Sequence, residues 1–331
     1  MKILPSAVAA VSAILLSSAA VAAAPAPTRV GVILKGLDNP FFVAMFEGAR
    51  AEASRVGARV TIRAATGIGD LAGQATRARA LAAAGQACYV ANPIDRTNLI
   101  DPLRGVGRPV VNVDSVIDPA AARRAGISIA TYVGTDNAAA GALAARAMQA
   151  LLPRGGDIAL VGGLALDISS HQRLAGFVRH ARRTNLRIAV RVAADFDRTK
   201  AQLAAQRVMW ARPAVVGFFA ANDEMALGIS DAVRAAGGPG KVKIIGVDGI
   251  PEVLDAISSG SITATVSQYP YAMGQMAVRA CVVAARGATL PAWVKAPIAL
   301  VTRANVGRAL ATFPLPFRTY ADPLTPLLGR R

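Results

Sequence analysis

The stretch RVGVILKGLDNPFFVAMFEGAR, residues 29–50, joins two hydrophobic patterns through a polar turn. Residues 30–34 form a short apolar run, as expected for a buried strand. From Phe41 to Val56 the apolar side chains recur at helical spacing and share one face. That face carries Phe42, Met45, Phe46 and Ala49. The stretch therefore predicts a strand followed by an amphipathic helix.

The same strand-then-helix cycle repeats in two successive blocks as far as about Arg303. Short apolar strands joined by crossovers of a dozen or more residues are typical of parallel sheets covered by helices. The pattern predicts an α/β fold of two doubly wound lobes with parallel-sheet cores. The strand-like runs are residues 30–34, 59–62, 88–91, 110–113, 130–135, 158–161, 188–193, 215–220 and 242–247.

The N-terminus predicts export. Lys2 precedes a stretch rich in Ser, Ala, Leu and Val over residues 6–24. This composition predicts a signal peptide over residues 1–24, cleaved near Ala22, and an uncleaved membrane anchor is the alternative. The 331 residues fit about two domains at roughly 150 residues each. We expect the mature protein to be soluble and exported.

The chain is strongly basic, with a formal net charge of +17. Lys2 is the only charge in the predicted signal peptide, so cleavage lowers the net charge by one to +16. Export and the dispersal of the Arg residues argue against a nucleic-acid partner and favour an anionic envelope surface. Cys88 and Cys281 lie far apart in apolar runs. We expect buried free thiols, although the two could pair in an oxidising compartment.

Polar side chains follow five of these strand-like runs and a further apolar run at residues 263–267. Ligands of open parallel sheets bind beyond the carboxyl ends of the strands, so these side chains are candidates for a shared cleft. Helix capping could explain Asn39-Pro40, Asn92-Pro93 and Asn222 equally well, but it does not explain Gln268. The six candidates are Asn39, Asn92, Asp114, Asn222, Asp248 and Gln268.

Aromatic and cationic side chains lie beside these candidates. Phe41 and Phe42 follow Asn39-Pro40, and Phe196 lies between two Asp residues. Rings next to amides and carboxylates suit a sugar, whose C–H faces stack on aromatic rings. Phe41 and Phe42 could instead only begin the helix. Arg173 could donate to a ring oxygen or to two hydroxyls, or it could be a solvated surface residue.

No motif indicates a cofactor or a metal. The two histidines, His171 and His180, fall on opposite faces of one helix, and no HExxH, CxxC or GxSxG is present. We expect no cofactor and no catalytic residue. Asp114 and Asp248 leave one enzymatic alternative open, an exported glycoside hydrolase that uses them as an acid/base pair.

Taken together, these motifs resemble the ribose-binding-protein family of periplasmic sugar-binding proteins that serve ABC importers. The resemblance extends from about Arg29 to Thr302, with all motifs in the family's order. It rests on Asn39-Pro40-Phe41-Phe42, Asn92-Pro93, Arg173 to Gly176-Phe177, Asp195-Phe196-Asp197, the run from Asn222 to Gly228, and Val247-Asp248-Gly249 to Gln268.

The resemblance implies two Rossmann-like lobes joined by three crossovers, near Thr135, Gln268 and Ala299. The N-terminal lobe would contain residues 29–135 and 269–299. The C-terminal lobe would contain residues 136–268 and 300–312. Residues 313–331 extend past the family's usual end.

The resemblance also assigns roles to the candidate residues. Asn39, Asn92 and Asp114 would bind hydroxyls from the first lobe, where Phe41 and Phe42 would pack on the ring. Arg173, Asn222 and Asp248 would bind from the second lobe, Phe196 would form the other stacking wall, and Gln268 would contribute from the hinge. The chain has Asp114-Ser115 where ribose-binding members have an Asp-Arg pair, so the resemblance also makes Ser115 a candidate ligand-binding residue. The guanidinium is a charge-assisted donor worth about 1.5–3 kcal/mol, so a sugar other than ribose is expected.

We therefore expect a periplasmic binding protein that captures a neutral monosaccharide or sugar alcohol by hinge closure. It would deliver this ligand to an ABC transporter permease and would be monomeric. The alternative partner is a membrane chemoreceptor or sensor histidine kinase, which would also contact the closed surface.

Overall fold

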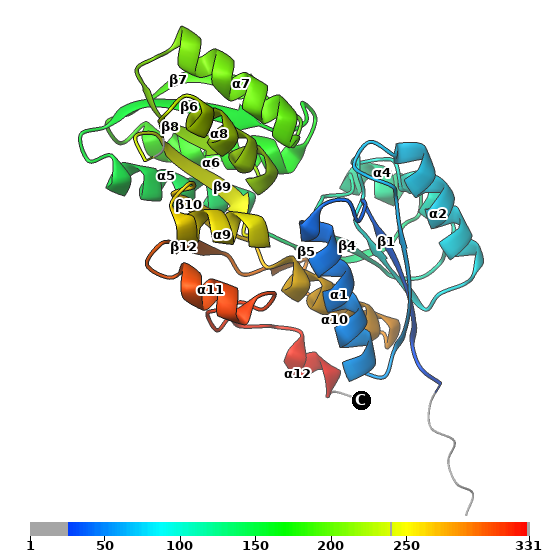
Figure 1. The fold of residues 1–331 in the computed structure, drawn as a ribbon. Helices are drawn as coiled ribbons and strands as arrows, with labels where there is room; N and C mark the ends of the chain where they lie inside the picture. The colour runs from blue at the N-terminus through cyan, green and yellow to red at the C-terminus, as the bar shows by residue number, and fades with distance from the viewer. Residues whose placement is uncertain (1–25, 239, 330–331) are drawn as a thin grey trace, which may run out of the picture.

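The computed structural model describes residues 26–238 and 240–329, which form two lobes (Figure 1). Residues of both lobes line a cleft between them. Each lobe is built around one six-stranded sheet with helices on both faces. The predicted α/β fold of two lobes is confirmed. The predicted signal peptide, residues 1–24, lies outside the described residues.

The sheet of the N-terminal lobe is parallel throughout, with the strand order β11-β5-β4-β3-β1-β2. Its strands are β1 (Arg29–Leu34), β2 (Arg59–Ala64), β3 (Cys88–Ala91), β4 (Val110–Val113), β5 (Ile129–Gly134) and β11 (Trp293–Lys295). The helices of this lobe are α1 (Pro40–Arg55), α2 (Leu71–Ala83), α3 (Ile100–Leu103), α4 (Pro119–Arg124) and α10 (Pro270–Ala285).

The sheet of the C-terminal lobe has the order β12-β10-β9-β8-β6-β7, in which only the edge strand β12 is antiparallel. Its strands are β6 (Gly156–Gly162), β7 (Leu186–Ala193), β8 (Val215–Ala220), β9 (Lys243–Asp248), β10 (Ala264–Ser267) and β12 (Ala299–Thr302). Its helices are α5 (Asn137–Leu151), α6 (Ile168–Ala181), α7 (Arg198–Ala211), α8 (Asp223–Ala235), α9 (Pro251–Ser259) and α11 (Val306–Thr312).

The chain passes between the two sheets three times, from β5 to α5, from β10 to α10 and from β11 to β12. The connections are short, since only Thr135 and Asp136 separate β5 from α5. The carboxyl ends of the parallel strands face the cleft, where the sheet geometry favours a ligand site. None of the helices within the described residues combines the length and apolarity needed to span a bilayer.

Helix pairs in both lobes pack closely through glycines. In the N-terminal lobe, a Cβ at Gly48 of α1 would strike the backbone of Tyr271, and a Cβ at Gly274 of α10 would strike that of Met45. In the C-terminal lobe, a Cβ at Gly176 of α6 would strike the backbone of Ala138 in α5. The close approach therefore requires glycine, and it fixes the position of α6, which carries Arg173.

The expectation of two free thiols is wrong, because Cys88 and Cys281 form a disulfide. Their Cα atoms lie 5.6 Å apart, within the normal range for a disulfide. Cys88 lies on β3, and Cys281 lies on α10, which covers that strand. The two are 193 residues apart in sequence, because most of the C-terminal lobe, from α5 to β10, lies between them in the chain.

Residues 313–329 lead from the C-terminal lobe back to the N-terminal lobe (Figure 1). The ring of Phe317 packs edge-on against Tyr269 at the second crossover, with 6.3 Å between ring centroids. Leu324 is fully buried, and the short helix α12 (Thr325–Leu328) contacts α10. Arg279 of α10 pairs with Asp322. This C-terminal segment is thus a further link between the lobes.

Candidate functional site

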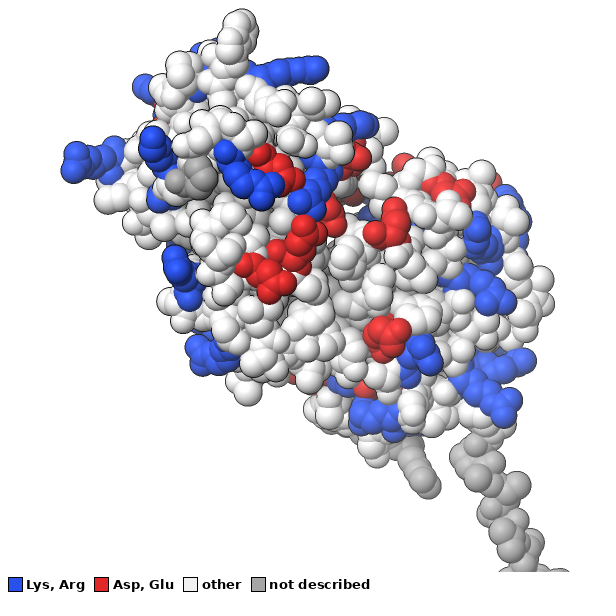
Figure 2. Space-filling view, in the orientation of Figure 1, with Lys and Arg blue, Asp and Glu red and all other residues white. Residues whose placement is uncertain are grey.

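A cavity of about 510 Å³ lies in the cleft, and both lobes contribute to its walls. We call it the first compartment. Figure 2 shows Asp and Glu side chains gathered where the lobes meet, whereas Lys and Arg side chains lie mainly over the outer faces in that view. The lining residues are Lys35, Asp38, Asn39, Phe41, Phe42, Ile68, Asp114, Leu164, Asp167, Ser169, Arg173, Asp195, Phe196, Asp197, Arg198, Lys200, Asn222, Glu224, Asp248 and Gln268.

The structure places nine of the eleven predicted site residues on the wall of the first compartment. The other two are Asn92 and Ser115. Asn92 is fully buried, and its amide contacts the sulfur of Met45 at 3.8 Å. Ser115 faces a neighbouring cavity and donates to Asp114. The nine are Asn39, Phe41, Phe42, Asp114, Arg173, Phe196, Asn222, Asp248 and Gln268.

The cleft also concentrates unusual backbone conformations. Among the described residues, the non-glycine positions with positive φ are Asp114 (61°), Asp195 (54°), Phe196 (62°), Asp248 (141°) and Tyr269 (57°). The first four line the first compartment, and Tyr269 directly follows Gln268. Such conformations cost about 1–3 kcal/mol each and tend to cluster at functional sites. Their position supports a binding role for this cavity independently of side-chain chemistry.

Capping and ligand binding are compatible at Asn39 and Asn222. The Asn39 side-chain oxygen accepts from the backbone N–H of Phe41 at 2.8 Å, and the Asn222 oxygen accepts from Met225 at 3.0 Å. Each oxygen caps a helix that begins at the edge of the cleft. The amide nitrogen of each side chain is then oriented, and its N–H groups can donate to a ligand.

Arg173 is buried and held by three groups of the C-terminal lobe. Its Nε donates to Asn137 at 2.8 Å, one Nη donates to the carbonyl of Ala221 at 2.6 Å, and the same Nη lies 3.5 Å from Asp248. These partners fix the guanidinium plane, so its other N–H groups have a defined direction. Helix α6 begins at Ile168, which places Arg173 in the second helical turn.

Asp248 is the buried carboxylate at the end of β9. Gln268 donates to it through Nε2 at 2.5 Å, which joins the hinge to the C-terminal lobe. Burial raises the pKa of Asp248 well above its ordinary value, and the charge of Arg173 offsets only part of this effect. The Oε1 atom of Gln268 is buried without a hydrogen-bond partner in the described structure. An acceptor of this kind on a cavity wall is suited to a ligand hydroxyl.

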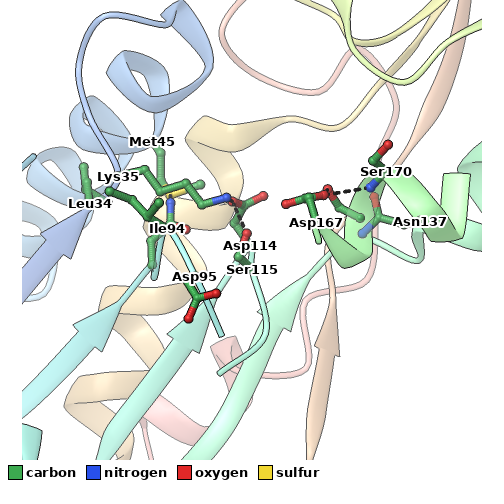
Figure 3. Close-up of polar contacts among 12 residues, drawn as sticks. Leu34, Lys35, Met45, Ile94, Asp95, Asp114, Ser115, Asn137, Asp167 and Ser170 are labelled. Carbon is green, nitrogen blue, oxygen red and sulfur yellow. Dashed lines mark hydrogen bonds and ion pairs between the residues drawn. The ribbon is translucent and has the colours of Figure 1, made fainter. Parts of the chain in front are cut away.

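Lys35, which the sequence reading missed, carries a positive charge into the N-terminal side of the cleft. Its Nζ lies 3.7 Å from Asp114 and 5.7 Å from the centroid of the Phe42 ring. Figure 3 shows Lys35 reaching Asp114, with Asp167 facing them from the opposite lobe. Burial raises the pKa of Asp114 despite the nearby charges of Lys35 and Arg173.

Asp167 was also missed. It caps α6 through the N–H of Ser170 at 2.8 Å. Burial would raise its pKa, but the charge of Lys35 and the hydrogen bonds from Ser169 and Ser170 outweigh that effect and lower it. Asp114 and Asp167 therefore have opposite protonation tendencies across the cleft. The signals in the sequence were simple, because Lys35 directly follows the first strand and Asp167 precedes Ile-Ser-Ser at a helix start.

The aromatic side chains occupy two sides of the first compartment. Phe41 and Phe42 pack edge-to-face, with ring centroids 5.2 Å apart, on the N-terminal lobe. Phe196 comes from the loop between β7 and α7 of the opposite lobe. A Cβ at position 163 would overlap the Phe196 ring, so Gly163 makes room for it. A flat guest could therefore contact aromatic rings from both lobes.

Comparison with known proteins agrees with this geometry. Residues 30–289 match the family model described as periplasmic binding protein domain. The D-allose-binding periplasmic protein of Escherichia coli is 33% identical over 289 residues, covering 86% of this chain and 92% of that protein. The D-ribose/D-allose-binding protein of Pseudomonas aeruginosa is 28% identical over 264 residues, covering 78% and 82%.

Solved structures have the same fold. An ABC transporter solute-binding protein from Agrobacterium vitis with bound α-D-tagatopyranose has a TM-score of 0.80 and 25% identity, covering 86% of this chain and 98% of that one. A periplasmic solute-binding protein from Actinobacillus succinogenes with bound D-allose has a TM-score of 0.79 and 24% identity, covering 85% and 99%. The chain belongs to the periplasmic binding protein family.

Proposed function

We propose that the chain binds a neutral monosaccharide or sugar alcohol in the first compartment and delivers it to an ABC transporter permease. The observation that carries this proposal is the composition of one cavity wall. Polar side chains from both lobes and three Phe rings surround a single space between hinged halves. Sugars need this combination, because their C–H faces stack on rings while their hydroxyls require fixed donors and acceptors.

Both lobes would supply hydrogen-bond acceptors and donors to the ligand. Asp114 and Asp248 would accept from ligand hydroxyls, while Arg173 and the amides of Asn39 and Asn222 would donate. Lys35 would supply, beside Asp114, the cationic donor that Ser115 lacks. Closure excludes water and strengthens these interactions, and a ligand missing one hydroxyl would leave a buried group unpaired. The first sugars to test are those in the relatives' names, D-allose and D-ribose.

Titration calorimetry with D-allose, D-ribose, D-tagatose, D-arabinose and myo-inositol tests the proposal. We expect at least one to bind with a Kd below about 10 μM and to raise the melting temperature by mass action. Asp248→Asn should weaken that binding about 10- to 100-fold, as for loss of a charged hydrogen-bond partner. Asp255→Asn, at an exposed position on α9, is the matched control and should leave Kd unchanged. Absence of binding to every carbohydrate would refute the proposal.

The loaded, closed form would contact the permease through surfaces of both lobes. A chemoreceptor or sensor kinase is the competing partner, since it would also contact the closed form. Pull-down from membranes with and without sugar separates the two. Recovery of permease subunits alone supports transport, whereas recovery of a receptor alone would assign the protein to sensing.

A further inference from the structure

A second cavity of about 350 Å³ adjoins the first compartment. We call it the second compartment. The two compartments share the wall residues Ile68, Asp114, Leu164, Asp167 and Ser169. Asp114 and Asp167 face each other at this boundary, as Figure 3 shows. A guest held in the first compartment can therefore extend a substituent past the two carboxylates into the second.

The second compartment has apolar walls from both lobes. Leu71, Ile94 and Val116 come from the N-terminal lobe, and Leu166 and Ile168 come from the C-terminal lobe. Leu166 is 83% exposed and Leu71 is 43% exposed, both large values for leucine beside a cavity. Exposed apolar surface next to a binding cleft favours a guest that removes it from water.

The polar groups around the second compartment are largely bonded to the protein itself. The Tyr132 hydroxyl donates to the backbone carbonyl of Asp114 at 2.6 Å, and Ser115 donates to the Asp114 carboxylate. The Asn137 oxygen accepts from Arg173, and Asp95 accepts from Thr97. The first compartment instead presents the unpaired acceptor of Gln268. This difference disfavours a second sugar ring, whose hydroxyls would need unoccupied donors and acceptors.

We infer that the second compartment binds an apolar alkyl or aryl substituent attached to the sugar in the first compartment, so that the chain takes glycosides as well as free sugars. This inference rests on the proposed function, because the sugar anchors the substituent. The linking oxygen would lie near Lys35, Asp114 and Asp167, where the lysine can donate to it.

Calorimetry with the α and β anomers of methyl and phenyl glycosides of D-allose and D-ribose tests the inference. We expect one phenyl glycoside to bind about tenfold or more tightly than the methyl glycoside of the same sugar and anomer. Binding of the free sugars alone, with every phenyl glycoside no tighter than its methyl counterpart, would overturn the inference and leave the proposed function intact. Failure of free sugars and glycosides alike would instead refute the proposed function.

Variants of the second compartment test whether the phenyl ring binds there. Leu166→Asp places a charge on the apolar wall at an exposed position, so the fold should tolerate it. It should remove the tighter binding of the phenyl glycoside relative to the methyl glycoside. The affinity for the methyl glycoside itself should stay within twofold. Val116→Trp, which fills the compartment, should do the same. Leu203→Asp is the matched control, since Leu203 is 48% exposed on α7 and lines neither compartment. An unchanged phenyl advantage in both wall variants would place the ring elsewhere.

The same glycosides test the hydrolase alternative. Chromatography after prolonged incubation should recover them intact, which supports binding without catalysis. Release of phenol that is lost in Asp114→Asn would show that Asp114 takes part in cleaving the glycosidic bond, and the second compartment would then bind a leaving group rather than a transported substituent.

Discussion

Each lobe contains one fully buried carboxylate, and the two are stabilised in opposite ways. In the N-terminal lobe, Glu52 of α1 accepts from Arg55 at 2.6 and 2.9 Å and from Arg279 at 2.7 Å. In the C-terminal lobe, Asp223 of α8 accepts from the backbone N–H groups of Gly249 at 2.6 Å and Ile250 at 3.1 Å. Cations thus compensate one carboxylate, and mainly neutral dipoles compensate the other.

The pKa values of the two carboxyl groups move apart as a result. Burial alone would raise the pKa of Glu52, but hydrogen bonds and charge from Arg55 and Arg279 outweigh it and lower that pKa. Burial raises the pKa of Asp223 to about 6, because its neutral donors and the charge of Arg173 only partly offset desolvation.

The two carboxylates also serve different parts of the molecule. Glu52 holds Arg279, which pairs with Asp322 and so anchors the C-terminal segment. Asp223 binds the turn directly after Asp248 and also accepts from Thr265 at 2.7 Å. It therefore positions the strained backbone of a predicted ligand-binding residue. The charged network of Glu52 with Arg55 and Arg279 thus stabilises the N-terminal lobe. The neutral network of Asp223 with its backbone and hydroxyl donors instead supports the candidate ligand site.

The largest expected effect follows from breaking the charged network. Arg279→Leu would leave the Glu52 carboxylate buried with only the half-exposed Arg55 as its partner, and would also free Asp322. Removing one partner of a buried ion pair costs about 3–5 kcal/mol. Hydrogen exchange should show the loss in the N-terminal lobe. Arg286→Leu, at an exposed position on the same part of the chain, should cost less than about 0.5 kcal/mol. Equal losses in the two variants would contradict the prediction.

The disulfide comes next, since it too belongs only to the N-terminal lobe. Reduction of Cys88–Cys281 should lower the stability of that lobe by about 2–4 kcal/mol, because the crosslink restricts the unfolded chain over a long loop. Denaturant unfolding with and without reductant measures this, with the Cys88→Ala/Cys281→Ala variant as the control that reductant should not affect. If reduction lowered the hydrogen-exchange protection of β8 and β9 as much as that of β3 and α10, the disulfide would not stabilise the N-terminal lobe specifically.

Loss of the neutral network should cost less. Asp223→Ala would leave the N–H groups of Gly249 and Ile250 unpaired and remove a buried charge at the same time, for a net loss of about 1–3 kcal/mol. Sugar affinity should also fall, because Asp248 loses its support. Glu52→Ala is the informative counterpart, because it should lower stability without changing sugar affinity. A loss of sugar affinity in Glu52→Ala but not in Asp223→Ala would contradict the prediction.

The lobes and most of the cleft wall could be predicted from sequence, because apolar runs mark buried parallel strands and the carboxyl ends of such strands share one edge. That rule located Asn39, Asp114 and Asp248. It missed Lys35, which also follows a strand, because only Asn, Asp and Gln were considered at strand ends. It also missed Asp167, which lies five residues beyond the end of β6 and caps α6.

Other features depend on contacts between distant segments. The pairing of Cys88 with Cys281 requires that α10 return to β3 after the chain has formed α5 to β10 of the other lobe, and local pattern does not specify this return. The packing of Phe317 on Tyr269 likewise joins the C-terminal segment to a crossover. Asn92 follows the third strand as the rule requires, but its side chain lies beneath the cavity wall against Met45. Position at a strand end does not fix the direction of the side chain.

The smallest expected effect is a contrast between Glu52 and Asp223, because mild acid should stabilise the fold through Asp223 but not through Glu52. With a folded pKa of about 6 against an ordinary value of 3.8, folded Asp223 binds its proton more tightly than the unfolded chain does. Its contribution is therefore complete below about pH 4 and is lost as pH rises through 6, which gives a gain of about 1 kcal/mol between pH 7 and pH 5. The lowered pKa of Glu52 gives the opposite dependence, complete above its ordinary value of 4.5 and lost only in stronger acid.

Hydrogen exchange at pH 7 and pH 5, corrected for intrinsic rates, should thus show greater protection of β8 and β9 at pH 5 and little change in β3 and α10. Asp223→Asn keeps an acceptor but cannot titrate, so it should remove the pH dependence of the C-terminal lobe. Persistence of that dependence in Asp223→Asn would assign it to other carboxyl groups whose pKa burial raises, among them Asp248 and Glu224. Sugar affinity discriminates further, because protonation of Asp248 should weaken binding, whereas protonation of Asp223 strengthens the fold.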